Sequence, residues 1–192
     1  MGAVHGACRL SGYSFSQMIV FGFEAGMRAA EYARKGKHVT TIDHRLPAQE
    51  QELVCSFMEK KKDPISVNAL KRKLQQVMER DLFIVRNKAG MERALREIET
   101  IESDIARIQV PTFRRHNLEW MRAIEVTYLV EAARVIARSA LAREESRGFH
   151  YRSDFAKEDN ATWLRHTRVK CKEGKLVLDT FPVELDYLRP EP

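Results

Sequence analysis

Apolar residues recur every three or four positions along most of the chain up to about residue 144, and this period predicts helices. The first periodic run covers residues 13–35, and Gly36 suits the position just after a helix C-terminus. Gly22 and Gly26 interrupt this run, at a cost of roughly 1 kcal/mol each relative to alanine. We therefore expect another backbone to pack closely against the face that carries them.

Three longer periodic runs predict an antiparallel three-helix bundle at about 66–144. A shorter helix over about 48–61 precedes the bundle, and Pro47 suits its first turn. Ser66 is a suitable N-cap for the first bundle helix, which is expected to end near Arg86. Because the links between the helices are short, neighbouring helices are expected to run in opposite directions.

The second bundle helix carries the clearest apolar stripe in the chain, after a turn expected at residues 87–90. Pro111 is expected to stop it, and Asn117 can cap the third helix, which is expected to reach about Glu144. The third helix is predicted to bury a stripe formed by Leu118, Met121, Ile124, Tyr128, Ala132, Val135 and Ile136. Because further apolar residues lie off this stripe, we expect this helix at the centre of the bundle.

The tail from residue 149 onward has no helical period. Alternating apolar and polar residues after Lys175 favour one or two short strands, with Pro182 at a break or an edge. The predicted fold is therefore mainly α, with a loop-rich C-terminal tail. The predicted divisions are 1–46 for the first helix and a connector, 47–148 for the helical region and 149–192 for the tail.

Composition limits the classes of function. The chain has 192 residues, of which 44% are hydrophobic and 31% charged, as in ordinary globular proteins without a membrane span. Its net charge of +6 is spread among acidic residues and has its densest cluster at 60–62, which argues against a nucleic-acid partner. With no signal peptide evident, a cytoplasmic location is expected.

The sequence shows no complete catalytic constellation and no metal-ligand pattern. Cys8, Cys55 and Cys171 are odd in number and widely spaced, so they are interpreted as free thiols. None of the phosphate-binding loops, nucleophile elbows or zinc motifs with a known mechanism is present. Candidate chemistry is therefore confined to two segments rich in glycine, arginine and histidine.

The first segment is a glycine-punctuated loop over residues 4–15 that leads directly into the first helix. Free N–H groups and the positive end of the helix dipole suit an anionic ligand there, and Arg9 could bind a carboxylate. The second segment, residues 143–155, follows the third bundle helix and carries a dense mixture of charges. Its simplest interpretation is a network of salt bridges that fixes the tail to the bundle.

Both segments carry a family resemblance. Residues 5–15, with Val-Phe-Gly at 20–22 and Ala-Gly at 25–26, resemble the H-G-A-N-R-L-G-G-N-S-L…V-F-G…A-G segment of succinate dehydrogenase and fumarate reductase flavoprotein subunits. Residues 143–155 and the Trp-Leu-Arg-His-Thr run at 163–167 resemble the same family's R-x-E-S-R-G-x-H-x-R-x-D and W-L-K-H-T signatures. The resemblance covers essentially the whole chain and the last third of such a flavoprotein.

The resemblance implies an FAD-dependent enzyme that interconverts succinate and fumarate. It implies that Arg9 binds a carboxylate of the dicarboxylate substrate and that the backbone N–H groups of Ser14 and Phe15 contact the flavin. Residues without an assigned catalytic role, expected to be structural or to support the site, are His5, Arg147, His150 and Arg152. Cys8, Ser11 and Tyr13 depart from the family loop, so the choice of substrate is open.

The resemblance also implies what the chain lacks. The first helix would be left over from an FAD-binding domain whose main part is missing, and the chain alone is expected to be inactive. An iron–sulfur subunit could dock on it and hold it at the inner face of the membrane, and the exposed first helix could form a homo-oligomer. Two alternatives stay open: a non-catalytic helical docking module, and the equivalent part of an L-aspartate oxidase.

Overall fold

A computed structural model describes residue 7 and residues 12–36 and 45–185. The chain divides into two compact units, residues 1–52 and residues 53–192, which are described separately. Helices dominate both, so the prediction of a mainly helical fold is confirmed. None of the helices in the described ranges is long and apolar enough to cross a bilayer.

In the first unit, α1 spans Tyr13–Lys35, as the sequence predicts. Gly12 precedes it with φ of 97°, a left-handed conformation that glycine adopts without strain. Gly36 follows the helix as predicted, in an extended conformation with φ of −72°, and its N–H donates to the Tyr32 carbonyl. A Cβ at Gly22 or Gly26 would meet nothing within 4 Å in the described part of the chain, which supplies no closely packed backbone there.

Helix α2 spans Arg45–Ser56 and so begins before Pro47, at an earlier point than predicted. Its last turn belongs to the second unit, where the Val54 carbonyl accepts a hydrogen bond of 2.7 Å from the Trp120 indole. Residues 57–66 then lead to the bundle, and a backbone bridge pairs Ile65 with Ile108.

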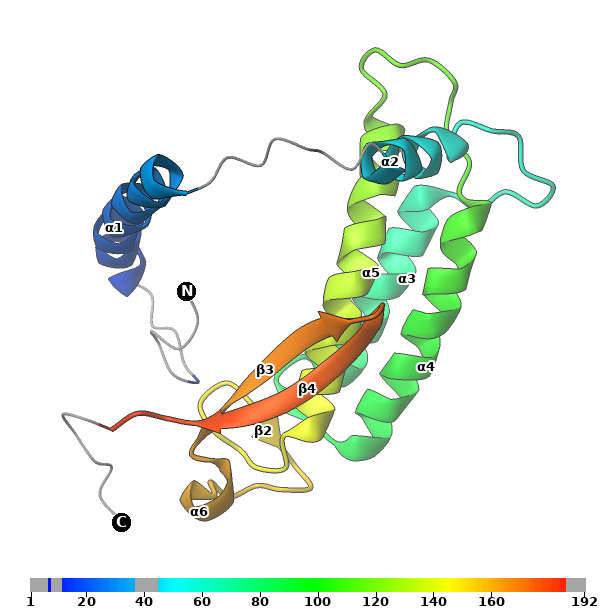
Figure 1. Ribbon diagram of the computed structural model, residues 1–192. Helices are drawn as coiled ribbons and strands as arrows, with labels where there is room; N and C mark the ends of the chain where they lie inside the picture. The colour runs from blue at the N-terminus through cyan, green and yellow to red at the C-terminus, as the bar shows by residue number, and fades with distance from the viewer. Residues whose placement is uncertain (1–6, 8–11, 37–44, 186–192) are drawn as a thin grey trace. The chain divides into compact units, whose positions relative to one another are not determined.

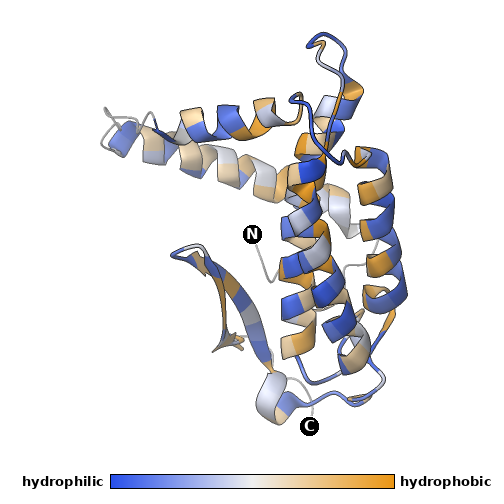
Figure 2. Cartoon of the chain, turned by 90° about the vertical axis from the view of Figure 1, so that its right-hand side faces the viewer, coloured by the Kyte–Doolittle hydropathy of each residue, from blue (hydrophilic) through white to orange (hydrophobic). Residues whose placement is uncertain are grey.

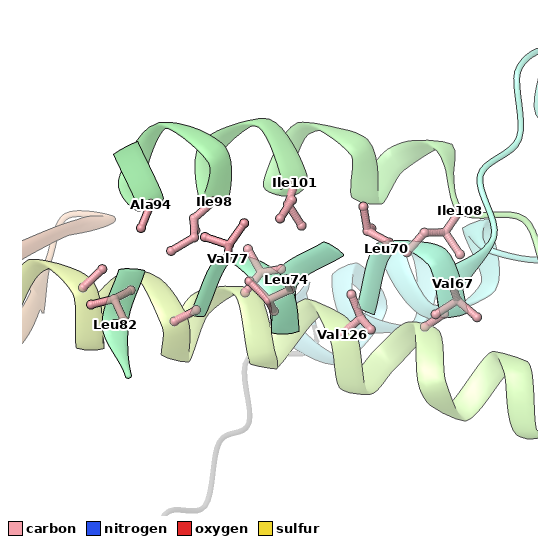
Figure 3. Packing of buried hydrophobic residues seen from close by; sticks show 14 of the residues in the cluster. Val67, Leu70, Leu74, Val77, Leu82, Ala94, Ile98, Ile101, Ile108 and Val126 are labelled. Carbon is pink, nitrogen blue, oxygen red and sulfur yellow. The ribbon is translucent and has the colours of Figure 1, made fainter. Parts of the chain in front are cut away.

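Three helices of the second unit, α3 (Val67–Leu82), α4 (Lys88–Asp104) and α5 (Leu118–Ala142), pack against one another (Figure 1). Helix α4 runs back along α3, so that Ala94 lies near Leu82 and Ile108 near Val67 (Figure 3). Fully buried side chains fill the space between them: Val67, Leu70, Leu74, Val77, Met91, Ala94, Ile98, Ile101, Val126 and Val130. In Figure 2, hydrophilic and hydrophobic residues alternate along these helices.

Helix boundaries differ from the predictions where capping decides them. Residues 87–90 are not a turn: the Asn87 side chain accepts a 2.8 Å hydrogen bond from the Gly90 N–H and caps α4. Asn117 caps α5 as predicted, accepting a hydrogen bond of 3.0 Å from the Trp120 N–H. Helix α3 ends at Leu82, four residues before the predicted end, because the chain turns there into a short strand.

The buried face of α5 differs from the predicted one, of which Ile124 alone packs against the core in the described structure. Small residues line the observed buried face: Ala123, Val126, Val130, Ala133, Ala137 and Ala140. Leu118, Met121 and Tyr128 are instead 57–65% exposed, so the expected central position of α5 is wrong. Alanine and valine on this face are small enough to let α3 and α4 approach α5 closely.

Two small sheets lie near the C-terminus, more strand structure than the sequence predicts. Strands β1 (Val85–Arg86) and β2 (Tyr151–Arg152) pair in parallel, and β3 (Arg165–Lys172) and β4 (Lys175–Pro182) form an antiparallel hairpin. Glu173 and Gly174 both have positive φ, as the tight turn of a two-residue hairpin requires. A short helix, α6 (Asn160–Trp163), precedes the hairpin, which lies beside α5 (Figure 1).

Candidate functional site

The first candidate segment is described only in part. His5 and Arg9 lie outside the described residues. Ser14 and Phe15 stand in the first turn of α1, where N–H groups have no partner within the helix and where no acidic residue is present. Phe15 is 72% exposed and Ser14 is half-buried. This helix end therefore offers positive partial charge to an anionic group.

The second candidate segment, residues 143–155, forms a charged cluster at one end of the bundle. Glu145 is fully buried and binds two cations, Arg143 and Arg147. Arg147 donates to both carboxylate oxygens, at 2.9 and 3.0 Å, and the Asp159 backbone N–H adds a bond of 3.0 Å. Burial by itself would raise the pKa of Glu145, but these hydrogen bonds and charges hold it below its usual value.

Arg152 is fully buried and connects two helix ends. It donates two hydrogen bonds to the Asp154 carboxylate, at 2.8 and 2.7 Å, and others to the carbonyls of Leu141 and Arg143 at 3.1 and 2.9 Å. Asp154 in turn accepts a bond of 2.9 Å from the Lys88 N–H, in the first turn of α4. The hydrogen bonds from Arg152 lower the pKa of Asp154. The pair thus places a cation at the C-terminus of α5 and an anion at the N-terminus of α4.

His150 connects the segment to the third helix end. Its Nδ1 lies 2.9 Å from a guanidinium nitrogen of Arg86, which also donates to the Leu82 and Phe83 carbonyls at the end of α3. Because a guanidinium only donates, His150 accepts at Nδ1 and carries its proton on Nε2, which lies 3.3 Å from the Arg143 carbonyl. Burial lowers the pKa of His150, and the charges of Arg86, Arg143 and Arg152 lower it further.

Arg143 connects the two C-terminal motifs. Its guanidinium donates to the Trp163 carbonyl at 3.1 Å and to the Arg165 carbonyl, and it lies 5.2 Å from the centre of the Trp163 ring. The structure therefore brings Arg147, His150 and Arg152 together in one cluster. Each of them is engaged by neighbouring protein groups. Among the described residues no group of three or more His, Cys, Asp or Glu side chains could hold a metal ion.

Sequence reasoning missed two members of such polar clusters, Arg86 and Asp81. A signal for Arg86 was available, because basic residues near a helix C-terminus commonly bind its last carbonyls. Asp154 was noted only as part of the family signature, and its bond to the start of α4 joins residues 66 positions apart, which no local pattern could show. Asp81 is 3% exposed and pairs with Arg80 and Arg93. Its position continues the apolar stripe of α3 four residues after Val77, and an acidic residue on such a stripe was the available signal.

Comparison with known proteins identifies the family. A family model described as fumarate reductase flavoprotein C-term matches residues 71–192. The chain belongs to the succinate dehydrogenase and fumarate reductase flavoprotein family. The fumarate reductase flavoprotein subunit of Haemophilus influenzae is 29% identical over 191 residues, which are 97% of this chain and 32% of that protein.

Two further relatives also cover nearly the whole of this flavoprotein chain. The succinate dehydrogenase flavoprotein subunit of Rickettsia bellii is 32% identical over 98% of the chain and 32% of its own length. A chain of E. coli quinol fumarate reductase matches with a TM-score of 0.86 and 25% identity, over 98% of this chain and 33% of that one. The chain thus spans about a third of the length of the relatives it matches.

His150 predicts a pH dependence of stability. Because its pKa is lowered on folding, the unfolded chain binds the proton more tightly, and stability should fall as the pH drops below about 6.5. The slope should approach about 1.4 kcal/mol per pH unit until His150 is protonated in the folded state. Urea unfolding between pH 7.5 and 5 should show this loss in the wild type, and less of it in His150→Gln. The same loss in His150→Gln as in the wild type would contradict the role of His150, and His166→Gln serves as the control.

Proposed function

We propose that this chain is the C-terminal part of an FAD-dependent oxidoreductase that interconverts succinate and fumarate. The family match over residues 71–192 carries the proposal, and the flavoprotein relatives over nearly the whole chain support it. In this proposal residues 1–46 belong to the flavin-binding part, 47–148 form the helical region with an antiparallel bundle, and 149–192 form the tail. The isolated chain is inactive because it holds only a minor part of the flavin site.

The N-terminus of α1 is suited to the flavin. Gly12 turns the backbone into a helix whose first turn holds Ser14 and Phe15 and no acidic side chain, so an anionic edge would meet N–H donors and a positive dipole. When bound, FAD supplies the hydride chemistry, and this chain supplies position and charge. Arg9 binds a carboxylate of the dicarboxylate substrate. His150, Arg147 and Arg152 hold the bundle end and tail together and act on the site only as structural support, as does His5.

Other proteins complete the assembly in this proposal. An iron–sulfur subunit is the proposed partner, and it places the flavoprotein in the cytoplasm at the inner face of the membrane. On α1, Phe15, Ile19 and Phe23 are 68–72% exposed. Such a face supports contact with the remainder of the flavin-binding part, or with a second copy where that part is absent.

Arg9→Ala tests the proposed chemistry. The chain is fused behind the flavin-binding portion of the R. bellii relative, and flavin absorbance and fumarate-dependent oxidation of a reduced dye are measured. Loss of a charged hydrogen bond to the substrate should cost about 1.5–3 kcal/mol, or roughly 10- to 100-fold in kcat/KM, with flavin absorbance retained. Arg34→Ala, an exposed arginine on α1, is the matched control. Equal turnover of Arg9→Ala and the control would remove Arg9 from the site.

A fusion that stays colourless and inactive would instead favour a non-catalytic docking module. One observation supports that second interpretation: the polar side chains of residues 143–154 that are described above are bound to one another and to helix ends. If the chain is a docking module, its 192 residues should bind the partner protein in the absence of FAD. Tight FAD binding by the unfused chain would contradict both interpretations.

A further inference from the structure

The hairpin of β3 and β4 (Figure 1) carries a surplus of positive charge on one of its faces. Side chains of a strand point alternately to its two faces, and residues directly opposite each other on paired strands share a face. The register places Lys170 opposite Val177 and Lys172 opposite Lys175, so these four residues lie on one face of the hairpin. All four are exposed. We name Lys170, Lys172 and Lys175 the lysine cluster.

The other face of the hairpin is apolar. Val169, Leu176 and Leu178 lie on it, and each of them is half-buried. Strand β3 also contacts α5, so the hairpin packs against the bundle. Because the apolar side chains are the ones shielded from water, their face is the inner one. The lysine cluster therefore lies on the outer face of the hairpin.

Within the described part of the chain, no carboxylate neutralises the lysine cluster. Asp179 lies on the same face, but both of its carboxylate oxygens accept hydrogen bonds of 2.8 Å from Arg168. None of the three lysines, and not Glu173 in the turn, forms an ion pair with a described residue. Lys172 and Lys175 stand directly opposite each other, where like charges destabilise a hairpin. Three uncompensated cations in an arrangement that weakens the hairpin point to an anion from outside it.

We propose that the lysine cluster binds an acidic, extended segment of a partner protein. Residues two apart on a strand are about 6.6 Å apart, and alternate side chains of an extended peptide have the same spacing. Alternate carboxylates of such a segment can therefore meet Lys170 and Lys172 in turn. Lys175 and the exposed side chain of Val177 lie across the hairpin from them, so the surface offers both charge and apolar contact to a polypeptide.

A second copy of the chain does not fit this surface. The chain has a net charge of +6, and two lysine clusters brought together would repel each other. Lysines on an exposed hairpin also protect it from pairing with the strands of another copy. The inference does not depend on bound flavin or on the proposed enzyme activity, so its test is separate from that of the proposed function.

Fluorescence anisotropy of a labelled peptide tests the proposal with the 192-residue chain. One short peptide alternates glutamate with threonine, and a second has glutamine in place of each glutamate. The chain should bind the glutamate peptide at least tenfold more tightly than the glutamine peptide. Raising the NaCl concentration from about 0.05 M to about 0.5 M should weaken this binding, because salt screens exposed charges. Equal affinities for the two peptides would overturn the proposal.

Single lysine variants locate the binding surface. Lys170→Gln and Lys172→Gln should each weaken binding of the glutamate peptide about two- to fivefold, as expected for the loss of one exposed ion pair. Lys62→Gln is the matched control, because Lys62 is also exposed and forms no ion pair with a described residue. Equal affinities of the control and the two hairpin variants would place the binding elsewhere and overturn the proposal.

Lys175→Glu separates binding from stability. This variant places opposite charges at the pair with Lys172, so the urea midpoint of unfolding should stay the same or rise. Binding of the glutamate peptide should nevertheless fall at least tenfold, because a cation of the cluster becomes an anion. Unchanged binding in Lys175→Glu would contradict the proposal, and so would a lower urea midpoint, since the lysine would then be needed by the fold.

Competition identifies the class of ligand. The glutamate peptide is displaced with inorganic polyphosphate and, separately, with vesicles that contain phosphatidylglycerol. We expect either competitor to act only at a higher concentration of anionic groups than an unlabelled glutamate peptide requires. Displacement at a lower concentration, lost in Lys175→Glu, would show a phosphate or lipid site and overturn the acidic polypeptide as its occupant.

Discussion

Replacing Glu145 with glutamine is expected to destabilise the second unit by about 3 kcal/mol. The carboxylate is fully buried and neutralises Arg143 and Arg147, whose side chains are only 15% and 20% exposed. Glutamine has the same shape but no charge, so the positive charges of the two neighbouring guanidinium groups would no longer be neutralised by residue 145. Breaking a buried ion pair from one side costs about 3–5 kcal/mol, and we expect the lower end because Arg147 keeps Glu158. Urea unfolding followed by circular dichroism measures the change.

The neighbouring Glu144→Gln is the matched control. Glu144 is exposed, and the same substitution there should change the free energy of unfolding by less than about 0.5 kcal/mol. If both variants unfolded at the same urea concentration, the buried carboxylate would not be what holds the tail. Near pH 4 the difference in unfolding free energy between Glu145→Gln and the wild type should be smaller. Because the pKa of Glu145 is lowered on folding, acid protonates this residue in the unfolded chain first, and the carboxylate's contribution to stability decreases.

Ile98→Ala is expected to cost about 2–5 kcal/mol, because it opens a cavity in the core. Ile98 has no exposed surface and lies on α4 facing α3 (Figure 3). The higher helix propensity of alanine offsets only a small part of this loss. The loss should therefore come from packing, and it should appear as a lower midpoint with an unchanged slope in urea.

The same substitution at an exposed position of α5 should have a much smaller effect. Ile136 is 48% exposed, so Ile136→Ala should change stability of the unfused chain by less than about 1 kcal/mol. Comparison of the two variants therefore tests whether Ile136 lies in the core, as the predicted stripe requires, or on the exposed side of α5, as the structure shows. A loss at Ile136 as large as that at Ile98 would restore the predicted stripe.

Periodicity predicted α3 and α4 well because each has a single apolar stripe between polar residues. It failed for α5, since a helix with two apolar faces gives no period that tells which face is inside. Only the fit of Ala133 and Ala137 against neighbouring helices decides this, and that fit depends on residues distant in sequence. The two-residue strands β1 and β2 were beyond prediction for the same reason, because the pairing of Val85 with Tyr151 joins parts of the chain that α4 and α5 separate.

For the candidate site, the sequence identified the charged segment but not the groups that its side chains bind. Residues 143–155 were correctly noted as a dense charge cluster, but the assignment of each partner needed the positions of helix ends. Arg152, for example, looks like a solvent-exposed arginine beside an aspartate until the end of α5 is placed next to it. The roles of Arg9, Ser14 and Phe15 stay predictions that rest on the family.

The charged cluster also bears on folding kinetics. Its members are close in sequence, yet they hold the end of α3 through Arg86, the start of α4 through Asp154 and the end of α5 through Arg152. These contacts can form only after the three helices have assembled, so they are expected to be weak or absent in the folding transition state. Interactions of that kind slow unfolding and have little influence on the folding rate. The cluster is therefore expected to lengthen the lifetime of the folded bundle by slowing unfolding, and to have little effect on the folding rate.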